Sequence, residues 1–139
     1  METKFVNSKY LLKFRNKIKL LSSRLNLVIK RLRKEKKIIH VYGASTKGNI
    51  ILQYSKIDKK DVSFAADRNP LKWNRKMPGS DIPIISEKTS RSKKPDFYLV
   101  LPWYFKKVFI SREKKFLSKG GRLIFPLPNV EIVSKKKSN

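Results

Sequence analysis

The residues best suited to binding chemistry form a short segment, GASTKGN, that runs from Gly43 to Asn49 and follows the β-branched run at 38–42. A glycine at each end of such a turn lets the chain bend sharply and lets a helix begin close to a sheet. Backbone N–H groups and the helix dipole can then face an anion. The segment therefore predicts a phosphate-binding turn, and Ser45 and Lys47 inside it strengthen that prediction.

The same turn excludes two common nucleotide-binding motifs. Asn49 and Ile50 follow Gly48, where a Walker A loop requires Lys and then Ser or Thr. Ser45 occupies the second glycine position of the G-x-G-x-x-G pattern. A tight strand-to-helix turn with no ligand is the alternative interpretation, and the spacing alone leaves it open.

A second polar segment, DRNP, begins at Asp67, two dozen residues after Gly43. An acidic side chain at about this spacing commonly accepts hydrogen bonds from a ribose. Arg68 and Arg75 could neutralise a diphosphate, and Trp73 or Trp103 could stack on a base or a sugar ring. The alternative is that Asp67 caps the turn that follows it.

Catalytic groups are harder to find. The single histidine, His40, lies within a predicted strand and is expected to be a core residue. The order of residues gives no Ser-His-Asp set, no pair of catalytic carboxylates and no metal triad. The chain has no cysteine, which excludes disulfides, thiolate metal sites and a thiol nucleophile. The residues by themselves predict a binding domain with no metal.

These polar segments must be positioned by strands and helices, which the hydrophobic pattern locates. Strands are predicted at 38–42, 61–67, 82–85, 96–101, 122–126 and 131–133, and helices at 48–54 and 105–117, with Gly120-Gly121 ending the second. Such alternation predicts a doubly wound, mostly parallel sheet, a Rossmann-like three-layer α/β fold. The polar segments fall at the carboxyl ends of strands, which meet at one edge of the sheet.

A long helix is predicted ahead of the first strand. Apolar residues recur at steps of three and four, without Gly or Pro from Tyr10 to Lys37, and Asn7 or Ser8 is a suitable N-cap. The apolar positions are Leu11, Phe14, Ile18, Leu21, Leu25, Val28 and Leu32. A helix of this length, about 40 Å, exceeds what a hundred-residue domain covers. Part of its apolar stripe is therefore expected to meet another chain or a second copy, the alternative being packing on its own sheet.

The composition leaves two interpretations of the charge open. The 139 residues carry a formal charge of +25, spread from Lys4 to Lys137. This charge suits a polyanion partner, but it also fits a lysine-biased composition on solvated surfaces. No segment approaches the ~20 apolar residues of a membrane span, so we expect a cytoplasmic protein with no membrane partner. The predicted divisions are a basic helix at 1–37, a Rossmann-like domain at 38–133 and a disordered basic tail at 134–139.

Three segments taken together resemble the C-terminal domain of the S-adenosylmethionine-dependent nucleotide-sugar C-methyltransferases. They are VYGASTKGN at 41–49, DRNP at 67–70 with PG at 78–79 and IPI at 82–84, and LPWYFK at 101–106 with GGR at 120–122. The resemblance extends from about Leu11 to Val133. Tyr104 departs from it, because the family usually has Asn after Pro-Trp.

The resemblance implies a nucleotide-diphosphate sugar as ligand. The positions that match are Gly43, Ser45, Lys47, Gly48, Asn49, Asp67, Arg68, Asn69 and Trp103. In the family a zinc-binding segment and a central domain precede this one, and the central domain holds the catalytic base and S-adenosylmethionine. We therefore expect no catalytic residue and no cofactor on this chain, and a partner methyltransferase chain or a homodimer through the first helix. The alternative is a basic polyanion-binding or nucleic-acid-binding protein that reuses the scaffold.

Overall fold

The computed structural model describes the backbone from residue 2 to residue 135, and the side chains from residue 9 onward except those of Leu11 and Phe14. Most of the predicted disordered tail, residues 136–139, lies outside the described part. One six-stranded sheet forms the centre, in the order β3-β2-β1-β4-β5-β6. Its strands are β1 (Ile39–Tyr42), β2 (Phe64–Asp67), β3 (Ile84–Ser86), β4 (Phe97–Val100), β5 (Arg122–Phe125) and β6 (Glu131–Val133).

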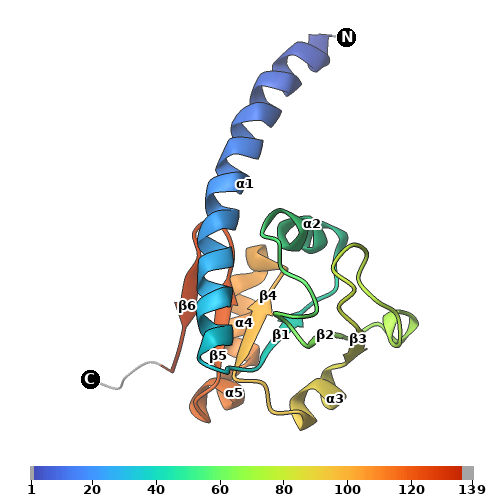
Figure 1. Ribbon diagram of the computed structural model, residues 1–139, viewed down its shortest axis with the longest axis vertical. Coiled ribbons are helices and arrows are strands. Elements are labelled where there is room, and N and C mark those ends of the chain that lie inside the picture. Colours follow the sequence, from blue (N-terminus) through green and yellow to red (C-terminus); the bar gives the residue numbers. More distant parts are fainter. Residues whose placement is uncertain (1, 136–139) are drawn as a thin grey trace.

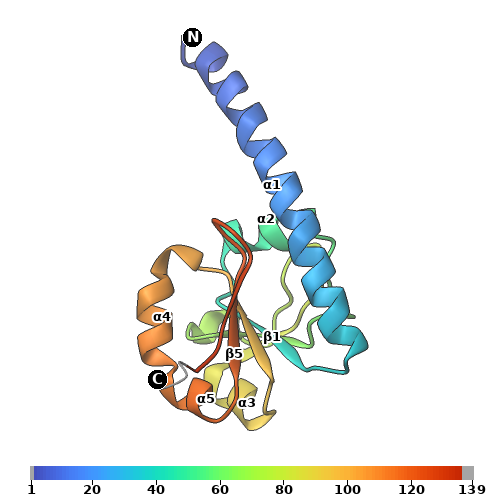
Figure 2. The same cartoon turned by 90° about the vertical axis from the view of Figure 1, so that its left-hand side faces the viewer.

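Helices cover both faces of this sheet (Figures 1 and 2). The helices α1 (Glu2–Lys34) and α2 (Thr46–Tyr54) lie on one face, and α3 (Glu87–Ser92), α4 (Lys106–Arg112) and α5 (Lys114–Ser118) lie on the other. The first five strands pair in parallel, and only β6 is antiparallel. The predicted Rossmann-like three-layer α/β class is confirmed.

The sheet reverses its winding direction between β1 and β4. From β1 the chain adds β2 and β3 on one side, and β4 then pairs on the other side, with His40 opposite Tyr98 and Val41 opposite Leu99. In open α/β sheets such a switch point leaves a crevice at the carboxyl ends of the two central strands. Here the segments after those strands begin at Gly43 and Leu101.

Alternate side chains of each central strand enter two separate cores. Val41 and Leu99 are fully buried in the larger core beneath α1 and α2, whereas Tyr42, Tyr98 and Val100 lie in the smaller core beneath α4 and α5. Fully burying an aliphatic or aromatic side chain contributes about 1.5–3 kcal/mol. The central strands β1 and β4 carry mainly apolar residues on both sides, because helices cover both faces of the sheet.

The long helix α1 begins and ends earlier than the sequence predicts. It starts at Glu2, so Asn7 and Ser8 lie inside it and the predicted N-cap is wrong. Its end at Lys34, rather than Lys37, follows from Lys36, whose φ of 61° breaks the helix. Three basic residues, Arg31, Arg33 and Lys34, occupy its last turn, where they complement the negative end of the helix dipole.

Only the carboxyl-terminal part of α1 packs on this molecule among the side chains described. The apolar residues Ile18, Leu21, Leu25, Ile29 and Leu32 are buried in the larger core. The amino-terminal turns extend past the sheet and α2 (Figure 1). Packing on its own sheet, one of the two interpretations of the apolar stripe, holds for the part of α1 from Ile18 onward. Contact of the earlier turns with another chain or a second copy stays a prediction.

Other elements differ from the predictions in detail. The predicted helix at 105–117 is divided at Glu113 into α4 and α5, because Glu113 (φ −99°, ψ 23°) departs from helical geometry. Gly120, with φ of 95°, ends α5 as predicted. The helix α3 was not predicted, since its sequence EKTSRS has no apolar periodicity. Its only signal is Ser86, whose side chain accepts a hydrogen bond from the Thr89 N–H.

Across the described residues, none of the helices combines the length and the apolar character that crossing a membrane requires.

Candidate functional site at the carboxyl edge of the sheet

The turn from Gly43 to Asn49 connects β1 to α2 at the switch point. Gly43 has a φ of 88°, and its N–H donates to the Ala66 carbonyl at 2.8 Å. Ser45 is the N-cap of α2, and its Oγ accepts a hydrogen bond from the Gly48 N–H at 3.0 Å. A Cβ at Gly48 would lie 2.4 Å from the Leu101 Cβ, so only glycine lets α2 approach β4 this closely. The two glycines have the geometric roles predicted for them.

The first turn of α2 leaves backbone donors available. Ser45 caps the Gly48 N–H, but no acceptor within the described residues lies against the N–H groups of Thr46 and Lys47. The Lys47 side chain is exposed, and its Nζ lies 6.0 Å from the centre of the Tyr104 ring. Asn49 instead donates through Nδ2 to the Pro78 carbonyl at 2.9 Å. This end of α2 therefore presents N–H groups and one ammonium group at the carboxyl edge of the sheet.

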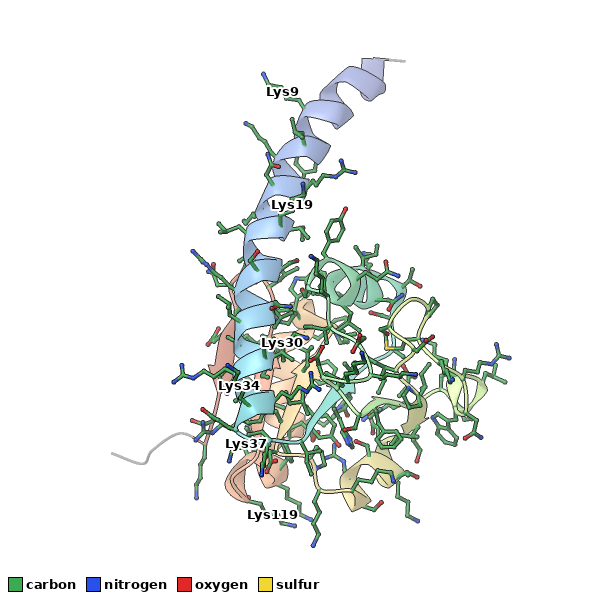
Figure 3. The ribbon with its side chains drawn as sticks, in the orientation of Figure 1. Lys9, Lys19, Lys30, Lys34, Lys37 and Lys119 are labelled. Carbon is green, nitrogen blue, oxygen red and sulfur yellow. The ribbon has the colours of Figure 1, made fainter. Side chains whose placement is uncertain are left out.

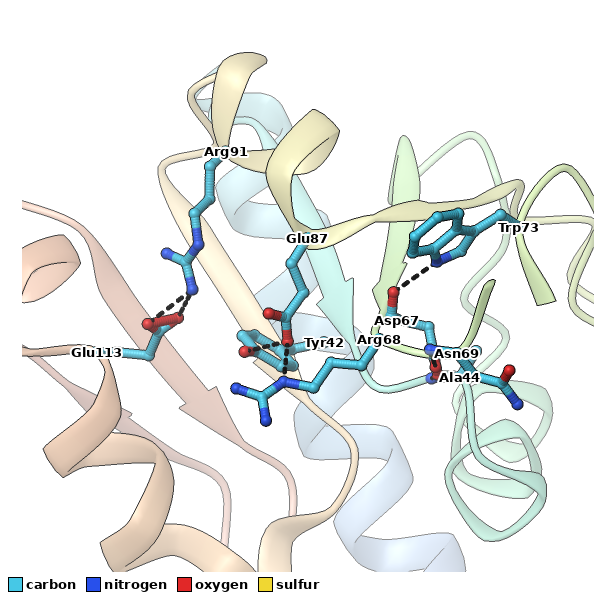
Figure 4. A network of polar contacts seen from close by, with 9 residues as sticks. All are labelled: Tyr42, Ala44, Asp67, Arg68, Asn69, Trp73, Glu87, Arg91 and Glu113. Carbon is cyan, nitrogen blue, oxygen red and sulfur yellow. Dashed lines mark hydrogen bonds and ion pairs between the residues drawn. The ribbon is translucent and has the colours of Figure 1, made fainter. Parts of the chain in front are cut away.

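Asp67 joins the first turn to the second polar segment (Figure 4). One carboxylate oxygen accepts the Ala44 N–H and the other accepts the Asn69 N–H, both at 2.8 Å. Lys72 Nζ lies 3.7 Å from the first oxygen and also donates to the Ala44 carbonyl at 2.9 Å. The alternative interpretation of Asp67 as a turn cap therefore describes its contacts, and a ribose hydroxyl would have to share these oxygens.

The other residues of the second segment also have partners within the protein. Asn69 caps a 3₁₀ turn, Pro70–Lys72, through the Leu71 N–H. Trp73 is half-buried, and its indole N–H donates to the Asp67 carbonyl at 2.7 Å (Figure 4). Trp73 thus packs against the larger core, whereas Arg75 is exposed.

Arg68 extends away from the first turn and meets Glu87 at the start of α3. Its Nε donates to Glu87 Oε1 at 3.1 Å, and the Tyr42 hydroxyl donates to the same oxygen at 2.5 Å (Figure 4). Burial, with the hydrogen bond to Glu87, raises the pKa of Tyr42 to about 12. Tyr42 is therefore a neutral hydrogen-bond donor near neutral pH and is not suited to act as a base.

Trp103 follows β4 on the opposite side of the switch point. It begins the 3₁₀ turn Trp103–Phe105, packs against the larger core, and lies edge to face with Tyr104 at 5.3 Å between ring centres. The carboxyl edge thus brings Lys47, Trp103 and Tyr104 together on one side of the crevice. Asp67 ends β2, and Arg68 and Asn69 follow it, so the nine predicted residues share the carboxyl edge of the sheet.

His40 is a core residue, as predicted. Its side chain is buried, with Nδ1 2.7 Å from Ser90 Oγ, which in turn lies 2.6 Å from the Tyr98 hydroxyl. Burial, with a smaller contribution from the positive charge of Lys93, lowers the pKa of His40 to about 4. It is therefore neutral at pH 7 and lies within the sheet, away from the crevice.

Sequence reasoning missed one group of functional candidates, the carboxylates that hold arginines on the α3 face. Glu113 is almost fully buried and pairs with Arg91, just as Glu87 pairs with Arg68 (Figure 4). The available signal was small: Glu113 is a single acid within a basic helical segment. No cluster of three potential metal ligands occurs among the residues that the structure describes.

The fold defines a Rossmann-like α/β domain, with the candidate residues gathered at the carboxyl edge of its sheet. The sequence matches the family model of the C-methyltransferase C-terminal domain over residues 1–128, and the chain belongs to this family. It is also 38% identical, over 98 residues, to the C-methyltransferase NovU of Streptomyces niveus. That match covers 70% of this chain and 23% of NovU, so the chain spans about a quarter of that relative's length.

Proposed function

We propose that this chain binds a nucleotide-diphosphate sugar at the carboxyl edge of its sheet, as the substrate-side module of a sugar C-methyltransferase. The observation that carries the proposal is the amino terminus of α2, where the N–H groups of Thr46 and Lys47 have no acceptor among the described residues. Lys47, in the first turn of this helix, has an exposed side chain whose Nζ lies 6.0 Å from the centre of the Tyr104 ring. A helix amino terminus with a free cation favours a phosphate group. Family membership supplies the C-methyltransferase context, and the sugar is what the resemblance of the three sequence segments to the nucleotide-sugar C-methyltransferases implies.

Methyl transfer, on this proposal, takes place with a separate catalytic chain that provides S-adenosylmethionine and the base. The buried and neutral His40 supports this division, because the one imidazole of the chain cannot reach the crevice. The projecting turns of α1 are the surface where we place the partner methyltransferase chain or a second copy. Exposed apolar side chains of Tyr10 and Leu12 lie on those turns.

The crevice gives the aromatic side chains of the third segment a role in this proposal. Trp103 and Tyr104 stand edge to face beside Lys47, so a flat base or a sugar ring could lie against them while the diphosphate meets α2. Arg68 supplies a second cation on the far side of Ala44. Asn49 donates a hydrogen bond to the Pro78 carbonyl. In this proposal it therefore holds the loop at 78–79 against α2 and does not contact the ligand.

Titration calorimetry with thymidine-diphosphate glucose tests this proposal. We expect binding to the wild type, and about tenfold weaker binding to Lys47→Ala, which is the loss of about 1.4 kcal/mol of charge-assisted contact. Lys59→Ala removes an exposed lysine elsewhere and is expected to bind as the wild type does. Asp67 is a poor test position, because both of its oxygens hold backbone N–H groups and its loss would disturb the turn itself.

Two results would overturn the proposal: no binding of any nucleotide sugar, or equal affinity of Lys47→Ala and the wild type.

A second candidate function, polyanion binding, is favoured by the charge of α1. Between Lys4 and Lys34 the helix carries eleven Lys or Arg residues and no acid. Lys9 and Lys19 stand on its projecting part, and Lys30 and Lys34 on the part beside the sheet (Figure 3). Binding to DNA through this helix would weaken steeply with salt, whereas a nucleotide sugar with few phosphate contacts would respond less. A salt titration of both ligands separates the two functions.

A further inference from the structure

A separate cleft lies on the sheet face covered by α3, α4 and α5. Its volume is about 750 Å³, and it extends from Arg68 and Glu87, at the carboxyl edge of the sheet, to Gly120 and Gly121, which precede β5 at the amino edge. Its volume is within the range of small-molecule sites, about 300–1,000 Å³. Most of its lining is distant in sequence from the turn that follows β1.

The cleft is rich in cations. Six of its fourteen lining residues are Lys or Arg, compared with 35 of 139 in the whole chain. They are Arg68, Arg91, Lys94, Arg112, Lys115 and Lys119. Three separate parts of the chain supply them: the segment after β2, α3 with the loop that follows it, and α4 with α5. The fold brings these cations together in one cleft. Their share of its lining is higher than the share of Lys and Arg in the whole chain.

In two ion pairs of this cleft, the carboxylate is more deeply buried than the arginine. The side chain of Glu113 is 3% exposed and that of Glu87 is 20% exposed, whereas those of Arg91 and Arg68 are 39% and 62% exposed. Each carboxylate lies beneath the arginine with which it pairs. The groups that face solvent are therefore mainly positive, and the carboxylates hold two guanidinium groups in place. Asp96, the remaining acid of the lining, is exposed, and one of its oxygens accepts the Ile38 N–H.

The two paired arginines retain donors for a ligand. Arg68 binds Glu87 through Nε, and its terminal nitrogens point away from that carboxylate (Figure 4). Arg91 uses one terminal nitrogen for both oxygens of Glu113. The other four cations of the cleft form no ion pair with a carboxylate among the described residues. A ligand with several anionic oxygens could thus meet several donors without displacing an internal partner.

We propose that this cleft binds a small molecule that carries a diphosphate or longer phosphate chain. The excess of solvent-facing cations selects a multiply charged anion, and the concave shape favours a small molecule over a flat macromolecular surface. Phe116, which is half-buried in the cleft wall, offers an apolar contact for the rest of such a ligand. The cleft shares Arg68 with the proposed nucleotide-sugar site, and its other five cations lie outside that site. The test therefore alters only those other cations.

Glycine-selective ¹⁵N labelling gives a test that separates the two sites. The chain has five glycines: Gly43 and Gly48 flank the first turn, Gly79 lies against Gln53, and Gly120 and Gly121 line the cleft. Titration with inorganic pyrophosphate at constant ionic strength is expected to shift the amide signals of Gly120 and Gly121 to saturation. Signals of Gly43 and Gly48 report independently on the turn.

Charge-matched double variants complete the experiment. Lys115→Gln with Lys119→Gln is expected to weaken the pyrophosphate response of Gly120 and Gly121 at least tenfold, whereas Lys59→Gln with Lys107→Gln, outside the cleft, is expected to change it less than twofold. Arg112→Gln is expected to weaken it as well. A thymidine diphosphate titration assigns the source of the phosphate, with tighter binding than pyrophosphate indicating a nucleotide and equal binding a free phosphate chain.

Unmoved signals of Gly120 and Gly121 in the wild type would overturn the proposal, as would equal losses in the two double variants, which indicate only a general charge effect. Either result leaves the test at Lys47 unaffected.

Discussion

His40 is held neutral by its surroundings, and this has a consequence for stability. It lies among Phe64, Tyr98 and Ser90, beneath Lys93, and its pKa falls from 6.5 to about 4 on folding. The unfolded chain takes up a proton at this group below pH 6.5, whereas the folded chain does so only near pH 4. Protonation therefore favours the unfolded state within this window, and stability contributed by the neutral form decreases as the pH falls.

We expect the free energy of unfolding to fall by up to about 3 kcal/mol through His40 between pH 6.5 and pH 4, and to be independent of this group above pH 7. Urea unfolding at several pH values measures it. His40→Gln keeps a hydrogen-bonding side chain beside Ser90 but does not titrate, so its unfolding free energy should depend less steeply on pH. Parallel pH profiles for the two proteins would contradict the prediction and assign the slope to carboxylates.

For single residues, the sequence predicted conformational roles better than it predicted hydrogen-bond partners. The conformational roles of Gly43 and Gly48 could be predicted, because a tight strand-to-helix turn calls for the residue that most readily adopts a positive φ and permits close backbone approach. The partners of Asp67 could not be predicted, since spacing permits both a ribose contact and a turn cap. Only the structure shows that both of its oxygens accept backbone N–H groups.

Among the elements, α1 is attached to the domain by polar contacts as well as apolar ones. Asp61, in the loop before β2, has a side chain that is 0% exposed, and both of its oxygens lie 2.7 Å from Lys30 Nζ. Arg33 donates to one of these oxygens at 3.3 Å. A buried carboxylate with two cationic partners is costly to alter, because removing its charge leaves both cations without a counter-charge.

We expect Asp61→Asn to lower the free energy of unfolding by about 2 kcal/mol. The pair of Glu35 with Arg31 is the matched control, since its atoms are 3.7 Å apart and its side chains are 50% and 82% exposed. Glu35→Gln should change stability by less than about 0.5 kcal/mol. Thermal and urea unfolding of both variants check the difference, and a loss at Asp61 as small as that at Glu35 would show that the ion pairs do not anchor α1.

The sequence predicts some helices and strands well and others not at all, and the difference has a physical cause. Strands with apolar side chains on both faces, such as β4, stand out in any hydrophobic profile. The helix α3 does not, because its six residues bury only Ser90. The division of the helix at Glu113 also left no mark in the sequence, since the buried pair with Arg91 that accompanies it joins residues 22 positions apart.

For the molecule as a whole, the projecting turns of α1 are predicted to add little to the stability of the isolated chain. The first side chain of α1 described as buried is Ile18. Deletion of residues 1–15 should therefore change the free energy of unfolding by less than about 0.5 kcal/mol, whereas deletion of residues 1–22 removes Ile18 and Leu21 from the core and should cost about 4 kcal/mol. Urea unfolding of the two truncated proteins measures both values.

A loss of 2 kcal/mol or more in the shorter deletion would mean that these turns pack on the domain and are not available to a partner. A retained fold, in contrast, allows the same protein to be tested for loss of partner binding, with the nucleotide-sugar affinity as an internal control.

The sequence by itself determined the class of this protein, since glycine turns, apolar strands and a long helical repeat are local patterns that the backbone must satisfy wherever they occur. It also placed the nine candidate residues at strand ends, and parallel strands bring such ends to one edge. The tertiary structure alone decided which polar groups at that edge already have partners within the protein. It also assembled the cation-lined cleft from segments far apart in the chain, because such contacts depend on how distant elements pack.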